Sequence, residues 1–388
     1  MSRARHTLIY WCGLEPRNGT SVQIARLFQH RLPFMNHVFW NTEAGGKSLC
    51  GSAKHIVVDD VWPLQRGARI LKWINTIIPK CRIPLRRCRS TKLAKLIKEY
   101  SSGDALAYVV VYNEEHARYA RDIIAAGGWN RYVVHVMDLL EPVGLRKGCT
   151  PSFDHLIANA SKVITINGEL ADEVGRIRNQ KSLVIPPCCS MPSGFQRTDI
   201  RTGPLRIAIV GALYNPCHTG GETMLSMLAR VVPKVANLLS IQLVSTSETL
   251  QRFPEKLRPY IEITGHLTPS KLDDLLRSCD ISCVTMTYEP GSIFRYSVPS
   301  RVADYLAFGL PTIAMVRPNT AMGTFLGRMD NKFVRLVGSD NELLAALLFY
   351  AENPEALAEG STLAASYAKR EFSTERWREA IDRAIDIG

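Results

Sequence analysis

Short apolar, β-branched runs alternate with longer amphipathic stretches along most of the chain. The run at 107–112 reads Ala-Tyr-Val-Val-Val-Tyr, and the run at 205–210 reads Leu-Arg-Ile-Ala-Ile-Val. Such runs are typical of buried strands, whereas the stretches between them carry the helical period. The same pattern predicts further strands at residues 7–12, 37–41, 55–58, 132–136, 241–245, 261–265 and 310–316. Strands that alternate with helices predict an α/β fold with parallel sheets.

The alternation of strands and helices occurs twice. A chain of 388 residues is longer than one ordinary hydrophobic core requires, which favours two domains. A loose polar stretch separates the two series of strands, as expected of a linker. We therefore predict an N-terminal domain at 1–190, a linker at 191–204, a C-terminal domain at 205–371 and a last amphipathic helix at 372–388.

The most informative stretch is Pro-Ser-Arg-Val-Ala-Asp-Tyr-Leu-Ala-Phe-Gly-Leu-Pro at residues 299–311. Pro299 suits the first turn of a helix, and Ser300 is expected to cap it. The free N–H groups of that turn and the permanent charge of Arg301 predict a site for phosphate or pyrophosphate. Asp304 lies one turn further on, where a carboxylate can accept hydrogen bonds from sugar hydroxyls. The alternative is an ordinary surface helix and strand without a ligand.

This stretch resembles the C-terminal motif of GT-B glycosyltransferases of the retaining "group 1", family 4-like type. Their usual motif is Pro-Ser-Lys-x-x-Glu-Tyr-Leu-Ala-x-Gly-x-Pro, and Arg301 and Asp304 keep the sign of each charge. The resemblance covers nearly all of residues 155–386 and the first strand, loop and helix, whereas residues 40–100 have no counterpart. It implies two Rossmann-like domains with parallel sheets that face each other across a cleft. It also implies that the C-terminal helix crosses back to the N-terminal domain.

The chain departs from the family at positions that carry charge. Family members place Arg after the Gly that ends the first C-terminal strand, and Lys-Gly several residues later, whereas this chain has Ala212 and Thr219 there. Arginines close to the motif are then expected to neutralise the donor phosphates. The Glu-x7-Glu signature is also missing, because Tyr296 lies at the place of the first carboxylate. Two alternatives follow: Glu289 takes over its role on a longer loop, or the role is lost.

The candidate site residues follow from this resemblance and from sheet geometry. Polar residues just past the carboxyl ends of parallel strands line the ligand crevice of such sheets, which points to Asn113, Glu114, His116 and Asp138. The predicted catalytic residues are Arg301, Glu289, Asp138 and His116. The predicted donor-binding residues are Gly19, Thr20, Gly211, His266, Arg295, Ser297, Val298, Ser300, Arg301 and Asp304.

The net charge of +12 comes from the first half of the chain. Residues 1–195 contain 27 Lys+Arg and 15 Asp+Glu, whereas residues 196–388 contain 21 of each. Residues 66–98 alone contain eleven basic residues and no acidic one, interleaved with Trp73 and several Ile and Leu. This segment fits an interfacial helix on an anionic membrane surface, and it fits a solvated basic helix equally well. No nucleic-acid-binding module is visible, so we expect no nucleic acid partner.

The cysteine spacing and the hydropathy of the sequence bear on metal sites, membrane segments and cellular location. The ten cysteines contain no CxxC pair and no His completes a zinc set, so we expect no metal and no cofactor beyond the donor substrate. The sequence contains no uninterrupted window of about 20 apolar residues, so it predicts no membrane-spanning helix. The first residues contain no long apolar region before the first strand. The expected location is therefore the cytoplasm, including the inner face of the membrane.

The resemblance implies a metal-independent glycosyltransferase of the hexosyltransferase type that serves polysaccharide or glycoconjugate biosynthesis. A sugar would move from a UDP- or GDP-linked donor on the C-terminal domain to a glycan or lipid-linked saccharide on the N-terminal domain, with retention. Two alternatives stay open. A nucleotide-sugar 2-epimerase would use the same fold without an acceptor. A non-catalytic GT-B subunit that binds a partner transferase would explain the missing basic pair and carboxylate.

Overall fold

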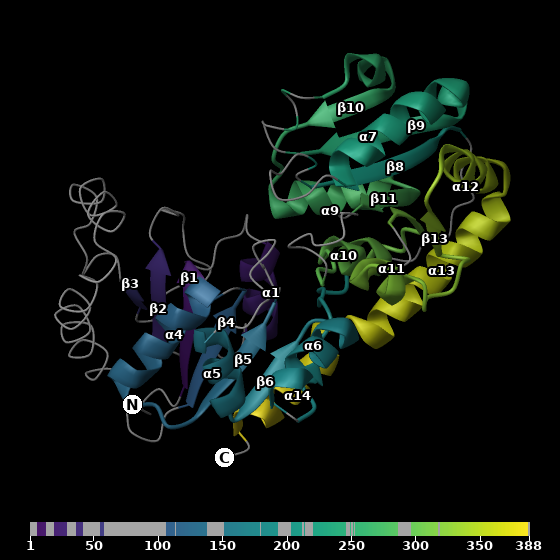
Figure 1. Ribbon diagram of the computed structural model, residues 1–388. Coiled ribbons are helices and arrows are strands. Elements are labelled where there is room, and N and C mark those ends of the chain that lie inside the picture. Colours follow the sequence, from purple (N-terminus) through teal and green to yellow (C-terminus); the bar gives the residue numbers. More distant parts are fainter. Residues whose placement is uncertain are drawn as a thin grey trace. The chain divides into compact units, whose positions relative to one another are not determined.

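The chain forms two compact units, each built on its own parallel sheet (Figure 1). The N-terminal unit contains the described residues up to Val184 and those from Arg378 onward, and the C-terminal unit contains Ile185–Trp377. The boundaries expected from the sequence stay a prediction. The computed structural model describes residues 6–12, 19–28, 36–41, 55–57, 106–112, 114–137, 151–178, 180–192, 203–211, 213, 220–245, 249, 251, 253–285, 296–316 and 319–386.

The N-terminal unit has a seven-stranded sheet with the order β3-β2-β1-β4-β5-β6-β7. Its strands are β1 (His6–Cys12), β2 (Asn36–Asn41), β3 (His55–Val57), β4 (Leu106–Val111), β5 (Tyr132–Val136), β6 (Lys162–Thr165) and β7 (Leu183–Val184). Its described helices are α1 (Gly19–Phe28), α4 (Glu114–Gly127), α5 (Pro151–Asn159) and α6 (Gly168–Arg178). Every residue of β4 and β5 is buried, as expected of central strands covered on both faces. The strand order reverses direction between β1 and β4.

The C-terminal unit has a six-stranded sheet with the order β10-β9-β8-β11-β12-β13. Its strands are β8 (Leu205–Val210), β9 (Leu239–Val244), β10 (Ile261–Thr264), β11 (Ile281–Thr285), β12 (Thr312–Met315) and β13 (Val334–Val337). Its helices include α7 (Gly220–Val231), α9 (Pro269–Ser278), α10 (Arg301–Ala307), α11 (Ala321–Leu326), α12 (Asp340–Glu352), α13 (Pro354–Glu371), α14 (Thr374–Asp386) and the 3-10 turns η4 (Val232–Lys234), η5 (Ala236–Leu238) and η6 (Glu255–Tyr260). Here the strand order reverses between β8 and β11.

The alternation of side chains along β8 separates two hydrophobic cores. Ile207 and Ile209 belong to a core with residues of α7 and α12, whereas Ala208 and Val210 belong to a second core with residues of α9, α10 and α13. Successive residues of a strand point to opposite faces of the sheet, so each face is covered by its own helices. The small side chain of Ala208 leaves room on the face that carries α10.

Helix α13 lies close to the residues that precede β12 and β13. A methyl group built on Gly360 would lie 2.6 Å from the carbonyl oxygen of Lys332 and 3.2 Å from Cγ of Pro311. Only a residue without a side chain fits at this approach. Buried residues of α13 and α10 share one hydrophobic core, and five of the seven residues of α10 are buried.

The first residues of the C-terminal unit are hydrogen-bonded to residues at the start of α14 and just before it. The N–H of Cys189 donates to the carbonyl oxygen of Phe372 at 2.9 Å, and the hydroxyl of Thr374 donates to the carbonyl oxygen of Cys189 at 2.9 Å. Helix α14 begins in the C-terminal unit and continues into the N-terminal unit from Arg378. The chain passes from one unit to the other after Val184 and after Trp377, and both places lie within a few residues of these hydrogen bonds.

The fold class expected from the sequence is confirmed, because both units have parallel, Rossmann-like sheets. Gly19 and Thr20, both predicted to bind the donor, form the first turn of α1.

A buried histidine couples the stability of the N-terminal unit to pH. The Tyr108 hydroxyl and Nδ1 of His135 lie 2.6 Å apart between β4 and β5, and both side chains are fully buried. Burial lowers the pKa of His135 from 6.5 to about 3. The folded state therefore keeps this imidazole neutral at a pH where the unfolded chain binds a proton.

Stability is expected to be complete above pH 6.5 and to fall as the pH drops from 6.5 toward 3. From His135 the loss is about 2 kcal/mol by pH 5, because each pKa unit corresponds to ~1.4 kcal/mol. Urea unfolding at pH 7, 6 and 5 measures it. His135→Gln should flatten the dependence, whereas His155→Gln, which changes an exposed imidazole, should not. Equal slopes in both variants would refute the assignment.

Candidate functional site

The candidate site lies at the carboxyl ends of β8 and β11, where the strand order of the C-terminal sheet reverses. Ligands of open α/β sheets bind at such switch points. Gly211 directly follows β8 and has a φ of 142°, which favours glycine. Its N–H donates to the carbonyl oxygen of Val244 at 2.9 Å, and its carbonyl oxygen accepts from the Ser245 hydroxyl at 2.5 Å. Both backbone groups of Gly211 are thus used inside the unit.

Arg301, the first residue of α10, lies beside Gly211. A methyl group built on Gly211 would lie 3.4 Å from Nε of Arg301 and 3.9 Å from its Cδ. Gly211 therefore lies within van der Waals range of the arginine, and its predicted role in donor binding stays a prediction. The Arg301 side chain is half-buried and has no carboxylate partner among the residues that the structure describes. A guanidinium in this state is available to an anionic ligand.

The predicted cap at Ser300 was wrong. Ser300 has helical backbone angles, with φ −58° and ψ −24°, and its side chain makes no capping hydrogen bond. The N–H groups of Val302 and Ala303 donate instead to the carbonyl oxygens of Pro299 and Ser300, at 3.2 and 3.1 Å. Two of the N–H groups expected to bind an anion are thus occupied. The charge of Arg301 remains as the principal anion-binding feature of this turn.

Tyr305 connects α10 to the end of β8. Its hydroxyl accepts from the N–H of Val210 at 2.9 Å and donates to the carbonyl oxygen of the same residue at 3.4 Å. Burial raises the pKa of Tyr305, and the charge of Arg301 partly opposes this shift. Asp304, half-buried in the first turn of α10, adds to the rise. Both charged residues predicted to bind the donor therefore lie close enough to influence one hydroxyl.

The other predicted donor-binding residues of the C-terminal unit are placed less favourably or lie elsewhere. Ser297 and Val298 are buried, with 3% and 6% of their surface exposed, so their side chains face protein. His266 is exposed in the loop after β10, at the same edge of the sheet but two strands away from β8. Arg295 and Glu289 lie outside the described residues, and their roles stay predictions.

The predicted site residues of the N-terminal unit gather at its own switch point. Gly19 and Thr20 begin α1 after β1, and His116 lies in the first turn of α4 after β4. Strands β1 and β4 are neighbours in the sheet. Burial lowers the pKa of His116 to about 4, so its imidazole is neutral at pH 7. Asn113 and Asp138 lie outside the described residues.

Glu114 has a structural task rather than a free carboxylate. Its two carboxylate oxygens accept from the N–H groups of Ser152 and Phe153 at 3.0 and 2.9 Å. These N–H groups belong to the first turn of α5, which has no intrahelical partner for them. Glu114 thus caps a neighbouring helix from α4. The sequence could not show this, since the two residues are 38 positions apart.

Tyr305 is the residue that sequence reasoning missed. It stands in the quoted motif, but its hydroxyl was given no role. A signal was present, because a tyrosine on the buried side of a helix needs a hydrogen-bond partner for its hydroxyl. Its spacing of four residues from Arg301 also places the two side chains on one face of α10.

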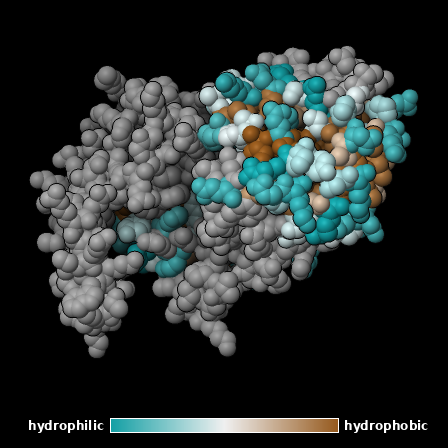
Figure 2. Space-filling model, turned by 90° about the horizontal axis from the view of Figure 1, so that it is seen from above, coloured by the Kyte–Doolittle hydropathy of each residue, from teal (hydrophilic) through white to brown (hydrophobic). Residues whose placement is uncertain are grey.

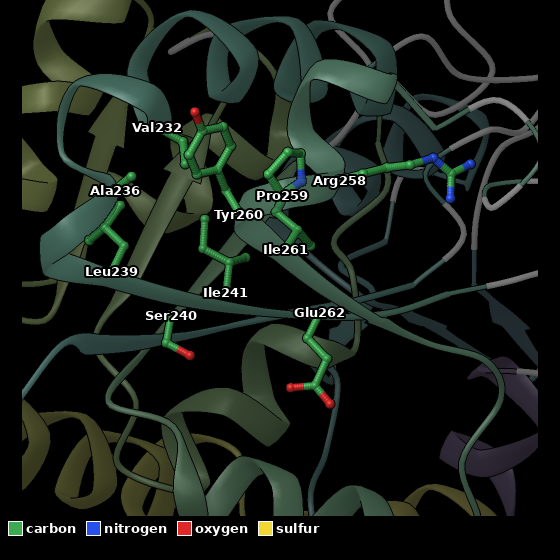
Figure 3. A pocket seen from close by; sticks show the side chains of 10 residues that line it. All are labelled: Val232, Ala236, Leu239, Ser240, Ile241, Arg258, Pro259, Tyr260, Ile261 and Glu262. Carbon is green, nitrogen blue, oxygen red and sulfur yellow. The ribbon is translucent and has the colours of Figure 1, made fainter.

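A separate pocket of about 390 Å³ lies at the opposite, amino edge of the C-terminal sheet (Figure 3). It is formed by the starts of β9 and β10 with η5 and η6, and its walls include Leu239, Ile241 and Tyr260. Arg258 extends away from the other lining side chains in Figure 3 and pairs with Glu255 at 2.8 Å. Figure 2 shows hydrophobic side chains at the surface of this unit. Without converging polar groups this pocket does not support a reaction.

The described residues contain neither a metal-binding cluster nor a membrane-spanning helix. Among the described residues, no three His, Cys, Asp or Glu side chains cluster so that they could hold a metal ion. Within these residues no helix combines the length and apolar character that crossing a bilayer requires. The basic segment at 66–98 lies outside the described residues.

Part of the C-terminal unit matches a known protein family. Residues 204–360 match the family described as "Glycosyl transferases group 1". No curated protein matches the chain in sequence. The family match contains the first residues after β8, α10 and the charged pair Arg301 and Asp304.

Solved structures resemble the whole chain. HepE from Anabaena, in complex with UDP and glucose, is 12% identical, with 99% of this chain and 100% of that chain covered at a TM-score of 0.68. TarM is 10% identical, with 98% and 99% covered at a TM-score of 0.68. Sucrose-phosphate synthase from Thermosynechococcus elongatus is 11% identical, with 98% of each chain covered at a TM-score of 0.63. The chain therefore has the GT-B fold, and residues 204–360 are similar to a group 1 glycosyltransferase domain.

Proposed function

We propose that the chain is a glycosyltransferase that moves a sugar from a UDP- or GDP-linked donor to a glycan or lipid-linked saccharide, with retention and without a metal ion. One observation carries the proposal: the Arg301 guanidinium, which pairs with no carboxylate in the described part of the chain, lies beside Gly211 at the switch point of the C-terminal sheet. This position falls within the segment that matches group 1 glycosyltransferases. An arginine at such a point suits a diphosphate better than a neutral ligand.

The chemistry explains why a positive charge is needed there. The bond between the sugar carbon and the diphosphate oxygen breaks, and a bond to the acceptor oxygen forms. The departing nucleoside diphosphate gains negative charge, while the proton of the acceptor hydroxyl passes to the released diphosphate or to water. A preorganised guanidinium stabilises that developing charge more than it stabilises the bound donor. Arg301 would thus act on the leaving group.

The remaining roles divide between the two units. Asp304, in the first turn of α10, would accept hydrogen bonds from donor hydroxyls. The acceptor would bind to the N-terminal unit, where the neutral imidazole of His116 lies at the sheet's switch point. HepE was solved in complexes with UDP and with UDP-glucose, which makes these compounds the first probes for this chain.

Replacing Arg301 should remove most of the activity. Arg301→Ala is expected to lower kcat/KM by about 10²–10³, as loss of a charge-stabilising donor does. Arg301→Lys should recover part of it, because the charge returns without the planar fork. The measurement is UDP release from UDP-sugar with and without an added saccharide acceptor.

Arg258→Ala is the matched control, since Arg258 is an exposed arginine of the same unit at the opposite edge of the sheet. It should keep the activity of the wild type. Equal losses in Arg258→Ala and Arg301→Ala would contradict the proposal. UDP release without any acceptor product would favour an epimerase, and absence of binding to UDP and GDP would favour a non-catalytic subunit.

Replacing Gly211 should weaken diphosphate binding, because an added methyl group would occupy the space beside Nε and Cδ of Arg301. Gly211→Ala and Gly203→Ala both place a methyl group at a positive φ, of 142° and 119°, and both should lose about 1 kcal/mol of stability. Nothing lies within 4 Å of a methyl group at Gly203, so this control carries the strain alone. Calorimetry should show UDP binding about tenfold weaker, or ~1.4 kcal/mol, only for Gly211→Ala. Equal affinities would refute the role given to Gly211.

The basic segment at 66–98 leads to a separate expectation about the membrane. Its eleven basic residues should bind anionic lipid, with each contributing about 1 kcal/mol near the surface. The protein should float with liposomes that contain phosphatidylserine and stay behind with neutral ones. Neutralising Arg86, Arg87 and Arg89 should abolish flotation. Equal flotation with neutral liposomes would exclude the electrostatic mechanism.

A further inference from the structure

Strands β8 and β11 lie side by side at the switch point but pair over only part of their length. The paired residues are Ile207 with Ile281 and Ala208 with Ser282. Continued in the same register, Val210 would pair with Val284. Instead β8 stays paired with β9 up to Val210, and β11 stays paired with β12 up to Thr285. The two central strands therefore part before their carboxyl ends.

A side chain takes the place of the missing backbone pairing. The Tyr305 hydroxyl meets both the N–H and the carbonyl oxygen of Val210, at 2.9 and 3.4 Å. Only 1% of the Tyr305 surface is exposed. Without this hydroxyl, the two backbone groups of Val210 would be buried and unsatisfied on that side, which is costly. One hydroxyl thus keeps the gap between the strands stable.

The same hydroxyl fixes the distance from α10 to β8. Arg301 lies one turn before Tyr305 on the helix, and its Nε reaches the space over Gly211, the residue that follows Val210. Buried residues of α13 pack with those of α10 in one hydrophobic core on the same face of the sheet. Tyr305 is the residue of α10 whose hydroxyl contacts β8.

We propose that Tyr305 is a positioning residue that acts through Arg301. Its hydroxyl holds β8 apart from β11 and sets the guanidinium over the end of β8. The inference rests on the proposed function in so far as Arg301 binds the donor diphosphate. Tyr305 itself touches protein backbone and not the reacting atoms, so its effect on turnover should exist only while Arg301 is present.

A double-mutant cycle tests this dependence. Tyr305→Phe should lower kcat for transfer from a UDP-sugar about tenfold with little change in the KM for the acceptor. In an Arg301→Ala background the same change should alter the rate by less than about twofold, because the residue through which it acts is gone. Equal factors in both backgrounds would overturn the proposal.

Tyr350→Phe is the control for a merely structural effect. Tyr350 is also 1% exposed in the C-terminal unit, and its hydroxyl donates to the carbonyl oxygen of Lys332 at 3.3 Å. Both variants should lower the melting temperature by a similar amount. Only Tyr305→Phe should change the rate, and a rate loss shared with Tyr350→Phe would overturn the proposal.

A readout without activity separates this inference from the proposed function. The Nε–H signal of Arg301 in ¹⁵N-arginine-labelled protein should move or broaden in Tyr305→Phe and stay unchanged in Tyr350→Phe. This result in a protein that binds neither UDP nor GDP would support the positioning role and reject the proposed function. An unchanged signal in Tyr305→Phe would reject the positioning role, whatever the wild type binds.

Discussion

The parting of β8 and β11 is the constraint on which the candidate site depends. A fully paired sheet would close the switch point with backbone hydrogen bonds and leave no place for a side chain. Here the pairing stops at Ala208 and Ser282, and the Tyr305 hydroxyl satisfies Val210 beyond that point. The Tyr305 hydroxyl thus replaces backbone hydrogen bonds between the two strands, and Tyr305 and Arg301 belong to the same helix, α10. A local exception in strand pairing positions the residue that the proposed chemistry needs.

Small residues make this arrangement possible. Gly211 leaves the space that the Arg301 side chain occupies, and Gly360 allows α13 to press against the turn that precedes β13. Ala208 and Ala314 lie on the face of the sheet that belongs to the α10 core. A side chain at Gly360 would meet backbone at 2.6 Å, whereas one at Gly211 would meet only the side chain of Arg301. The packing around α10 therefore contributes to the site together with its charged residues.

The sequence predicted the fold better than the site, and the reason is physical. Strands such as 132–136 and 205–210 are indicated by nearly continuous runs of apolar residues, and many apolar residues satisfy that pattern. The roles of Glu114, Gly211 and Tyr305 depend instead on partners far along the chain, at Ser152, Arg301 and Val210. The hydrophobic periodicity of a sequence is a local pattern and does not reveal such long-range contacts. The motif still indicated Arg301 and Asp304 correctly as a pair on one short helix, while the expected Ser300 cap failed because its backbone was already helical.

The same distinction explains how chains that are 10–12% identical share the GT-B fold at TM-scores near 0.68. Alternating apolar residues and turn residues are enough to rebuild two parallel sheets, so the fold tolerates almost complete replacement. A site does not, because each of its groups must meet a specific partner. Since the basic pair after β8 is replaced by Ala212 and Thr219, the positive charge at this edge rests on fewer residues. Arg301 can serve a diphosphate well only when its position is fixed, and Tyr305 and Gly211 are the described residues that lie closest to that task, through α10 and beside its guanidinium.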